Sequence, residues 1–136
     1  MPKLRRTSAL FAAAALAAAG TTGTTATAAE AETSSVKARN KAIARPMVAQ
    51  RGWSRAQFRC LERLWTRESN WHHRAGNRSS GAYGIPQAVP AHKMSTHGRD
   101  WRTNPRTQIA WGLSYIKQRY GTPCGAWSQF LARGWY

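Results

Sequence analysis

Glu68 is the residue whose type and position in this sequence point most directly to chemistry. At about 100° per residue, it falls within the apolar stripe of a predicted helix, beside Leu61, Leu64 and Trp65. The basic residues of the same segment fall on the other side of that helix: Arg55, Arg59, Arg63 and Arg67. A carboxyl group that faces inward loses hydration, which raises its pKa. Glu68 is therefore a candidate acid and base catalyst.

The inward position of Glu68 has two explanations, which the helix alone leaves open. In the first, the carboxylate neutralises a buried arginine or accepts backbone N–H bonds from a loop. In the second, aromatic side chains such as Trp65 and Trp71 desolvate the carboxyl group, so that it donates a proton near neutral pH.

The other acidic residues limit the reaction that Glu68 could serve. Glu30 and Glu32 lie in the N-terminal segment, and Glu62 lies roughly 120° around the helix from Glu68, which leaves Asp100. Most glycoside hydrolases need two carboxyl groups, so an enzyme of that kind is hard to assemble here. One glutamate suffices where the substrate supplies the nucleophile, such as a hydroxyl or acetamido group of a sugar.

Helices must position these residues, and the predicted ones cover residues 40–51, 54 to 67 or 70, 104–120 and 123–133. Pro46 is expected to kink or shorten the first. Ser54 and Gln57 form a capping box for the second, and Pro105 takes the first position of the third. Residues 76–98 are rich in Gly, Ser and Pro, with at most one short helix around residues 87–94. No segment alternates as a strand does, so the predicted fold class is mainly α, with a long irregular loop or small hairpin.

The N-terminus has the three parts of a signal peptide. A basic start precedes an apolar run over residues 9–20, and Ala26-Thr27-Ala28 fits a cleavage signal. The following segment is rich in Ala, Glu, Thr and Ser and has little to bury, so we expect a flexible leader. The predicted organisation is a signal peptide over residues 1–28, a leader over 29–38 and one domain over 39–136.

Three groups of residues together resemble the soluble lytic transglycosylase domain of the lysozyme-like superfamily, over about residues 40–136. The first is Glu68-Ser69-Asn70-Trp71, and the second is the SGAYGIPQ segment from Ser80 to Gln87. The third group follows along the next predicted helix: Asn104-Pro105, Gln108-Ile109, Trp111-Gly112, Tyr115-Ile116 and Tyr120-Gly121. Pro123-Cys124 and the Gly134-Trp135-Tyr136 ending are similar to the short secreted actinobacterial type.

The resemblance implies a lysozyme-like fold, with helices around a glycan-binding cleft and with Glu68 as general acid and base. It also implies that one segment lines the cleft through Ser80, Gly81, Tyr83, Gly84 and Gln87. In this resemblance, Gln87 hydrogen-bonds sugar or the catalytic glutamate.

The sequence departs from the family near its C-terminal end. Many members have Ala-Tyr-Asn facing the glutamate, where this chain has Ala126-Trp127-Ser128. Trp127 is counted with the substrate-binding residues. The partner of Glu68 stays open between Trp127, Tyr83 and Tyr136.

Composition indicates polyanionic partners and an oxidising compartment. The chain has 21 Lys and Arg against five Asp and Glu, and cleavage after residue 28 leaves 18 against five, a formal charge of +13. Such a surface attracts polyanions, and export favours the anionic polymers of a cell wall over nucleic acid. Cys60 and Cys124 are the only cysteines and are expected to form one disulfide. No zinc spacing is present, so no metal or cofactor is expected.

The preferred function is that of a peptidoglycan lytic transglycosylase, which breaks the MurNAc-GlcNAc bond with a single glutamate. The protein is expected to act as a monomer on glycan strands, secreted or associated with the cell wall after cleavage near Ala28. One alternative keeps the fold but is a muramidase-type hydrolase or resembles resuscitation-promoting factors. Another is a non-catalytic cationic protein that binds walls or acts against bacteria. Trp65, Trp111 and Trp127 are interpreted as core residues rather than a binding platform.

Overall fold

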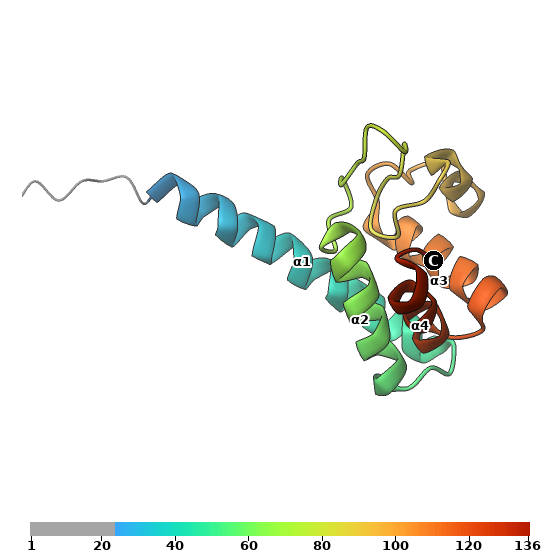
Figure 1. Ribbon diagram of the computed structural model, residues 1–136. Coiled ribbons are helices and arrows are strands. Elements are labelled where there is room, and N and C mark those ends of the chain that lie inside the picture. Colours follow the sequence, from blue (N-terminus) through green and yellow to red (C-terminus); the bar gives the residue numbers. More distant parts are fainter. Residues whose placement is uncertain (1–23) are drawn as a thin grey trace, which may run out of the picture.

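The computed structural model describes residues 24–136, so the predicted signal peptide lies largely outside the described residues. The elements, in chain order, are α1 (Thr24–Gln50), α2 (Arg55–Ser69), the 3-10 helix η1 (Ala91–His97), α3 (Pro105–Tyr120) and α4 (Pro123–Arg133) (Figure 1). The described part of the chain contains no strand. The predicted mainly helical fold class is therefore confirmed.

Helix α1 begins much earlier than expected, and its first half projects from the body of the protein (Figure 1). The predicted helix start at Asn40 was wrong, because α1 already includes residues 24–39, and the segment predicted as a leader, residues 29–38, forms a mostly exposed part of this helix. The physical reason is local: the segment lacks Gly and Pro, and half of it is Ala and Glu, which favour helix even without burial. Pro46 lies inside the helix, which continues to Gln50. No helix in residues 24–136 combines the length and the apolar character that a membrane span requires.

Helix α2 carries Glu68 and follows the predicted bounds. The Ser54 side chain accepts a hydrogen bond from the Gln57 N–H at its start, and Asn70 ends it in the left-handed conformation. The Gln57 side chain does not complete the predicted capping box. It accepts a hydrogen bond from the Cys124 N–H at 2.9 Å, and so joins α2 to the start of α4.

The main core lies between α2, α3, α4 and the second half of α1. Helix α3 starts at the Asn104 cap, and helix α4 starts at the Thr122 cap. The predicted disulfide is present between Cys60 of α2 and Cys124 of α4. The largest fully buried apolar side chains of this core are Leu61, Leu64, Trp65, Trp71, Ile85, Ile109, Leu113 and Ile116.

The segment between α2 and α3 is irregular, as predicted, and packs on a small core of its own. Its helix is η1, a few residues later than the expected 87–94. The small hairpin is reduced to isolated bridges that join Tyr83 to Gly76 and to Ala88. Ala88, Met94 and Trp101 form the buried cluster beneath this segment. The segment therefore forms a separate lobe above the end of α2 (Figure 1).

Candidate active site

Glu68 lies in the last turn of α2, where the helix meets the irregular segment. Its side chain is half-buried next to the buried Leu64 and Trp65, and this burial raises the pKa of the carboxyl group to about 7. Within residues 24–136, no hydrogen bond or ion pair to the Glu68 carboxylate is present. Pairing with a buried arginine or with backbone N–H groups therefore does not account for the inward position of Glu68. The geometry instead suits a proton donor near neutral pH.

Tyr136 lies near enough to Glu68 for the charge of the carboxylate to affect it. Its hydroxyl accepts a hydrogen bond from Trp65 Nε1 at 2.8 Å and donates one to the Pro86 carbonyl at 2.9 Å. Burial, and then the negative charge of Glu68, raise the pKa of Tyr136 well above its usual value. Tyr136 therefore stays protonated beside Glu68 and links α2 to the irregular segment.

The other two candidate partners of Glu68 are engaged elsewhere. The Tyr83 hydroxyl donates to the Arg102 carbonyl at 2.7 Å, and the Tyr83 ring meets Trp101 edge to face. Trp127 stacks on Phe130, with 5.6 Å between ring centroids. Of the three alternatives that the sequence left open, Tyr136 is the one whose pKa responds to the charge of Glu68, and none of the three hydrogen-bonds the Glu68 carboxylate in residues 24–136.

The Ser80 to Gln87 segment is fixed against α2 and α3 by buried polar side chains. The Ser69 hydroxyl, next to Glu68 in sequence, donates to the Ile85 carbonyl at 2.8 Å. The fully buried Gln108 accepts from the Ile85 N–H at 2.9 Å, and its amide donates to the carbonyls of His73 and Trp101. These bonds fix the segment relative to the catalytic candidate.

Gln108→Ala is expected to lower the free energy of unfolding by about 2–3 kcal/mol. The substitution leaves the Ile85 N–H and two carbonyls without their partner in a buried position, and unpaired buried groups are costly. Urea denaturation of the variant measures the loss. Gln118→Ala, an exposed change on the same helix, is the control and should leave the midpoint unchanged. Equal urea midpoints for the two variants would contradict the role of Gln108 in holding the segment in place.

The predicted site residues of this segment, other than Tyr83, differ in their exposure and in what they contact. Ser80 and Gly81 lie in the exposed turn that Asn77 closes, and Gly81 has φ +74°. Gly84, at φ +78°, lies against the Gln108 amide, where a Cβ atom has no room. The Gln87 amide donates to the carbonyls of Ala75 and Gly84, so it holds its own loop, and no bond from it to Glu68 is present in the described chain.

A groove runs from Tyr136 along α3. Its first part is a pocket of about 220 Å³. A second hollow of about 310 Å³ shares Lys93, Trp111 and Tyr115 with the first and continues along α3. The first part is lined by Pro86, Gln87, Ala88, Val89, Lys93, Trp111, Tyr115, Arg119 and Tyr136. Of the predicted substrate-binding residues, this groove contains Gln87.

Sequence reasoning missed the aromatic wall of this groove. Trp111 and Tyr115 stack at 5.1 Å between ring centroids, and the Arg119 guanidinium lies 5.6 Å from the Tyr115 ring. Trp111 is half-buried: it packs against the small core, as a core residue would, and also lines the groove. The signal was available: positions 111, 115 and 119 are four apart, which places them on one side of a helix.

Trp127 lines a different, shallow hollow of about 280 Å³. Its other lining residues are Lys41, Glu62, Arg63, Thr66 and Arg67. At about 100° per residue, those α2 positions lie on the side of the helix away from Glu68. Trp127 is therefore not brought together with the other predicted site residues.

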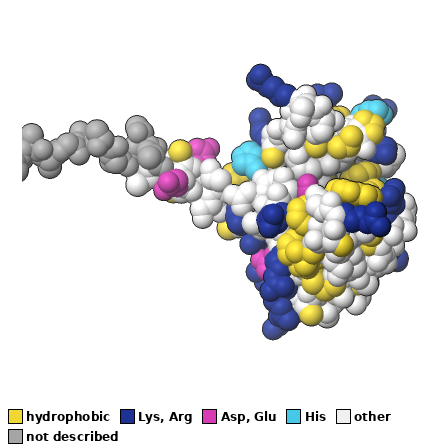
Figure 2. All heavy atoms as spheres, viewed as in Figure 1, with side chains coloured by type: hydrophobic (Ala, Val, Ile, Leu, Met, Phe, Trp, Pro, Cys, Tyr) yellow, Lys and Arg dark blue, Asp and Glu magenta, His cyan; other side chains and the backbone are white. Residues whose placement is uncertain are grey.

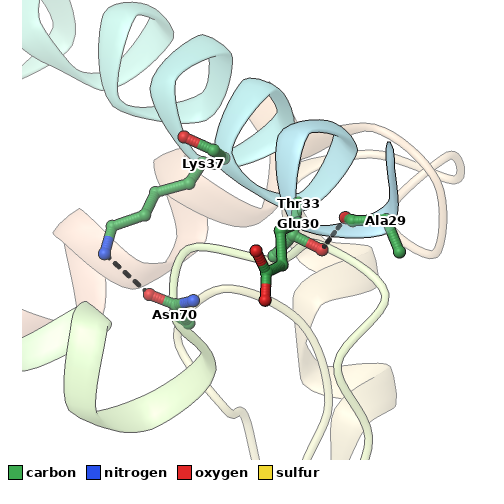
Figure 3. Close-up of a pocket in the computed structure, with 6 residues that line it drawn as sticks. Ala29, Glu30, Thr33, Lys37 and Asn70 are labelled. Atoms are coloured by element: carbon green, nitrogen blue, oxygen red, sulfur yellow. Dashed lines mark hydrogen bonds between the residues drawn. The ribbon is translucent and has the colours of Figure 1, made fainter. Parts of the chain in front are cut away.

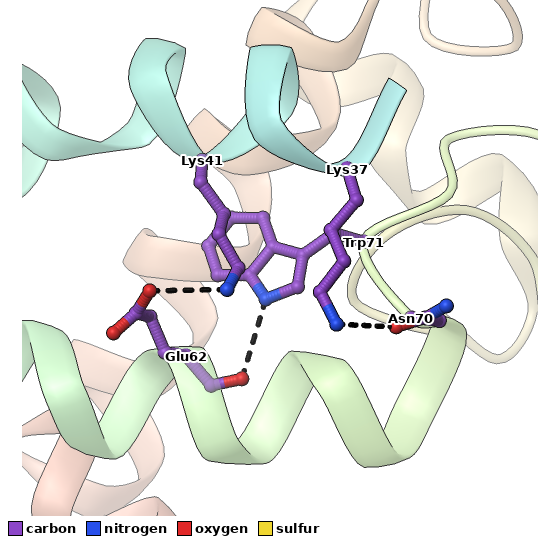
Figure 4. Close-up of polar contacts among 5 residues, drawn as sticks. All are labelled: Lys37, Lys41, Glu62, Asn70 and Trp71. Atoms are coloured by element: carbon purple, nitrogen blue, oxygen red, sulfur yellow. Dashed lines mark hydrogen bonds and ion pairs between the residues drawn. The ribbon is translucent and has the colours of Figure 1, made fainter. Parts of the chain in front are cut away.

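A hollow of about 430 Å³ lies between α1 and the end of α2 (Figure 3). The Lys37 ammonium spans it by donating to Asn70 Oδ1 at 2.7 Å. Nearby, Lys41 pairs with Glu62 at 3.1 Å, and Trp71 Nε1 donates to the Glu62 carbonyl (Figure 4). These contacts attach α1 to α2, and the hollow contains none of the predicted site residues.

The comparison with protein families matches this chain to the Transglycosylase SLT domain over residues 54–132. The match covers more than half of the chain and includes Glu68, so the protein belongs to this family. The family has a lytic transglycosylase-type function, the cleavage of peptidoglycan, and peptidoglycan is the substrate that it implies. Comparisons with curated proteins and with solved structures gave no significant match.

Proposed function

We propose that this protein is a secreted lytic transglycosylase that cleaves the MurNAc-GlcNAc bond of peptidoglycan, with Glu68 as its single catalytic carboxyl group. One observation carries the proposal: the half-buried Glu68 carboxyl group has a pKa raised to about 7 and lacks a hydrogen-bond or ion-pair partner in the described chain, and its charge acts on Tyr136, which lines a groove. A carboxyl group with this pKa is partly protonated at neutral pH and can both donate and accept a proton.

The proposed reaction uses one glutamate twice. Glu68 first gives its proton to the glycosidic oxygen, the bond from that oxygen to C1 of MurNAc breaks, and the GlcNAc side leaves as an alcohol. The C6 hydroxyl of the same MurNAc then forms a bond to C1, and the Glu68 carboxylate takes the hydroxyl proton. The product ends in 1,6-anhydro-MurNAc, and Glu68 returns to its protonated state without a water molecule being consumed.

The positions of the other acids support this single-carboxylate reaction. Asp100 accepts hydrogen bonds from Asn104 Nδ2 and Thr107 Oγ1, both at 2.7 Å, and the first of these is the main cause of its lowered pKa. Asp100 therefore stabilises the start of α3 through these hydrogen bonds. Glu62 pairs with Lys41, and the remaining two acids are on the exposed part of α1. A second carboxylate for hydrolysis by two acids is not at hand in residues 24–136.

The groove along α3 is the proposed glycan site. The stacked Trp111 and Tyr115 offer the flat apolar surface on which sugar rings pack, and Gln87, Lys93 and Arg119 provide polar groups around it. Tyr136 joins this groove to Glu68. Trp127 is left out of the proposed glycan site because it lines another face.

Secretion, with action at the wall, is part of the proposal. The composition of residues 1–28 and the Cys60–Cys124 bond support it, since disulfides persist in oxidising compartments. The formal charge of +13 after cleavage supports attraction to anionic wall polymers.

Mass spectrometry of muropeptides released from purified sacculi tests the proposed reaction. We expect products with 1,6-anhydro ends, each lighter by one water than the corresponding hydrolysis product. Reducing ends would instead assign the protein to the muramidase-type alternative. Binding without any release would assign it to the non-catalytic class.

The rate of cleavage is expected to fall by roughly tenfold for each pH unit above about pH 7. The first step needs protonated Glu68, and its pKa of about 7 means that the protonated fraction falls above this pH. Muropeptide release measured from pH 5.5 to 9 should show this decrease in rate above about pH 7. Binding to sacculi, measured at the same pH values, is the control. If the fall in the cleavage rate followed an apparent pKa near 4.5, the role of a desolvated Glu68 would be contradicted.

A further inference from the structure

The face of α2 opposite Glu68 carries a row of arginines that the proposed reaction does not use. These residues are exposed and four apart, which corresponds to about one helical turn and a rise of about 6 Å along the helix between neighbours. Figure 2 shows Lys and Arg side chains gathered over α2, next to a hydrophobic patch. We call the residues Arg55, Arg59, Arg63 and Arg67 the arginine face.

The arginine face is not neutralised by the surrounding protein. Glu62 is the other acidic residue of α2 besides Glu68, and its carboxylate pairs with Lys41 of α1 (Figure 4). Throughout residues 24–136, no ion pair involves the arginine face. Like charges four residues apart destabilise a helix. This face therefore carries an uncompensated positive charge that the fold itself does not require.

The arginine face borders the hollow in which Trp127 lies. Arg63 and Arg67 form part of the lining, together with Thr66 and the Lys41–Glu62 ion pair. The Arg67 guanidinium lies 5.6 Å from the Phe130 ring, on which Trp127 stacks. The hollow thus combines two arginines that have no acidic partner in residues 24–136, the Lys41–Glu62 ion pair, a threonine and an indole surface, which suits an anion attached to a polyol or a sugar.

We propose that the arginine face and this hollow form a second binding site, which holds a phosphodiester-linked polyol polymer of the bacterial wall. A line of cations at regular intervals fits a linear polyanion better than a single ion. The planar guanidinium fork matches a pair of phosphate oxygens. The site lies across α2 from Glu68, so the protein can hold the polymer while the groove holds a glycan strand.

Binding to purified poly(glycerol phosphate), measured by isothermal titration calorimetry, tests this site without reference to catalysis. The test variant carries Arg63→Gln with Arg67→Gln. We expect it to bind about tenfold more weakly than wild type, since two exposed ion pairs are lost. A second variant, Arg55→Gln with Arg59→Gln, removes charges that touch no ring and should weaken binding in the same direction.

The matched control carries Arg99→Gln with Arg106→Gln, which removes the same charge from exposed positions outside both sites. We expect it to bind within about twofold of wild type. An equal loss in the control and the test variant would overturn the proposal, because binding would then depend on net charge alone. Equally tight binding of polyglutamate or of a single-stranded oligonucleotide of the same length would overturn the assignment to a wall phosphodiester. Muropeptide release is independent of these outcomes, so the proposed function is tested separately.

Discussion

Glu68→Gln is expected to reduce peptidoglycan cleavage by at least about 10²- to 10⁴-fold, the usual contribution of general acid and base catalysis. Glutamine nearly matches glutamate in size and keeps the last turn of α2 filled, but it has no proton to transfer at neutral pH. The carboxyl group of Glu68, with a pKa raised to about 7, is the proposed donor to the glycosidic oxygen. Loss of turbidity and release of muropeptides from purified sacculi measure the effect.

The matched control is Glu62→Gln, which changes an acid of the same helix that pairs with Lys41 away from the groove. It is expected to keep wild-type activity. Equal activity of Glu68→Gln and wild type would remove Glu68 from the reaction and favour a binding function.

A stability measurement separates loss of chemistry from loss of fold in the Glu68 variant. Burial raises the folded-state pKa of Glu68 from 4.5 to about 7, so the folded protein binds this proton more tightly than the unfolded chain does. Proton binding by Glu68 therefore contributes to the stability of the fold. This contribution is fully present below about pH 4.5 and is lost as the pH rises through about 7. Glu68→Gln should therefore unfold at a temperature no lower than that of wild type at pH 8. An inactive variant that unfolded at a lower temperature would leave its inactivity open to a structural cause.

The position of Glu68 could be predicted because it depends on local geometry. The Ser54 cap fixes where α2 begins, and a regular helix then determines which side chains share a side with Leu61, Leu64 and Trp65. The starts of α3 and α4 follow from local signals in the same way, because Pro105 and Pro123 occupy first positions.

The aromatic neighbour of Glu68 and the walls of the groove could not be predicted in this way, because they depend on how distant segments pack. Tyr136 comes under the influence of the Glu68 charge because its hydroxyl bonds to Trp65 and Pro86, which are 71 and 50 residues away in sequence. Trp127 occupies the position in the family pattern that suggests a substrate contact, yet the packing of α4 places it in another hollow.

The early start of α1 was missed for the opposite reason. Little burial was expected for residues 29–38, and the structure agrees that most of them are exposed. Their intrinsic helix preference continues the helix that Asn40 and Ala44 anchor in the core. Composition that argues against a core does not by itself argue against a helix.

Removal of the disulfide by Cys60→Ala with Cys124→Ala is expected to lower the free energy of unfolding by about 4 kcal/mol. The bond closes a loop with a sequence separation of 64, and the chain-entropy model gives this value for a loop of that length. For a domain of this size, the melting temperature should fall by roughly 15–30 °C. Differential scanning calorimetry measures the shift.

Activity at low temperature should survive the loss of the bond, because Cys60 is two turns away from Glu68 and the α2 cap does not depend on it. Reduction of wild type with dithiothreitol should reproduce the lower melting temperature. Ser128→Ala, an exposed change on α4, is the control and should leave the melting temperature unchanged. If the double variant melted with wild type, α2 and α4 would be held together by packing and by the bond between Gln57 and Cys124 N–H, without a measurable contribution from the covalent link.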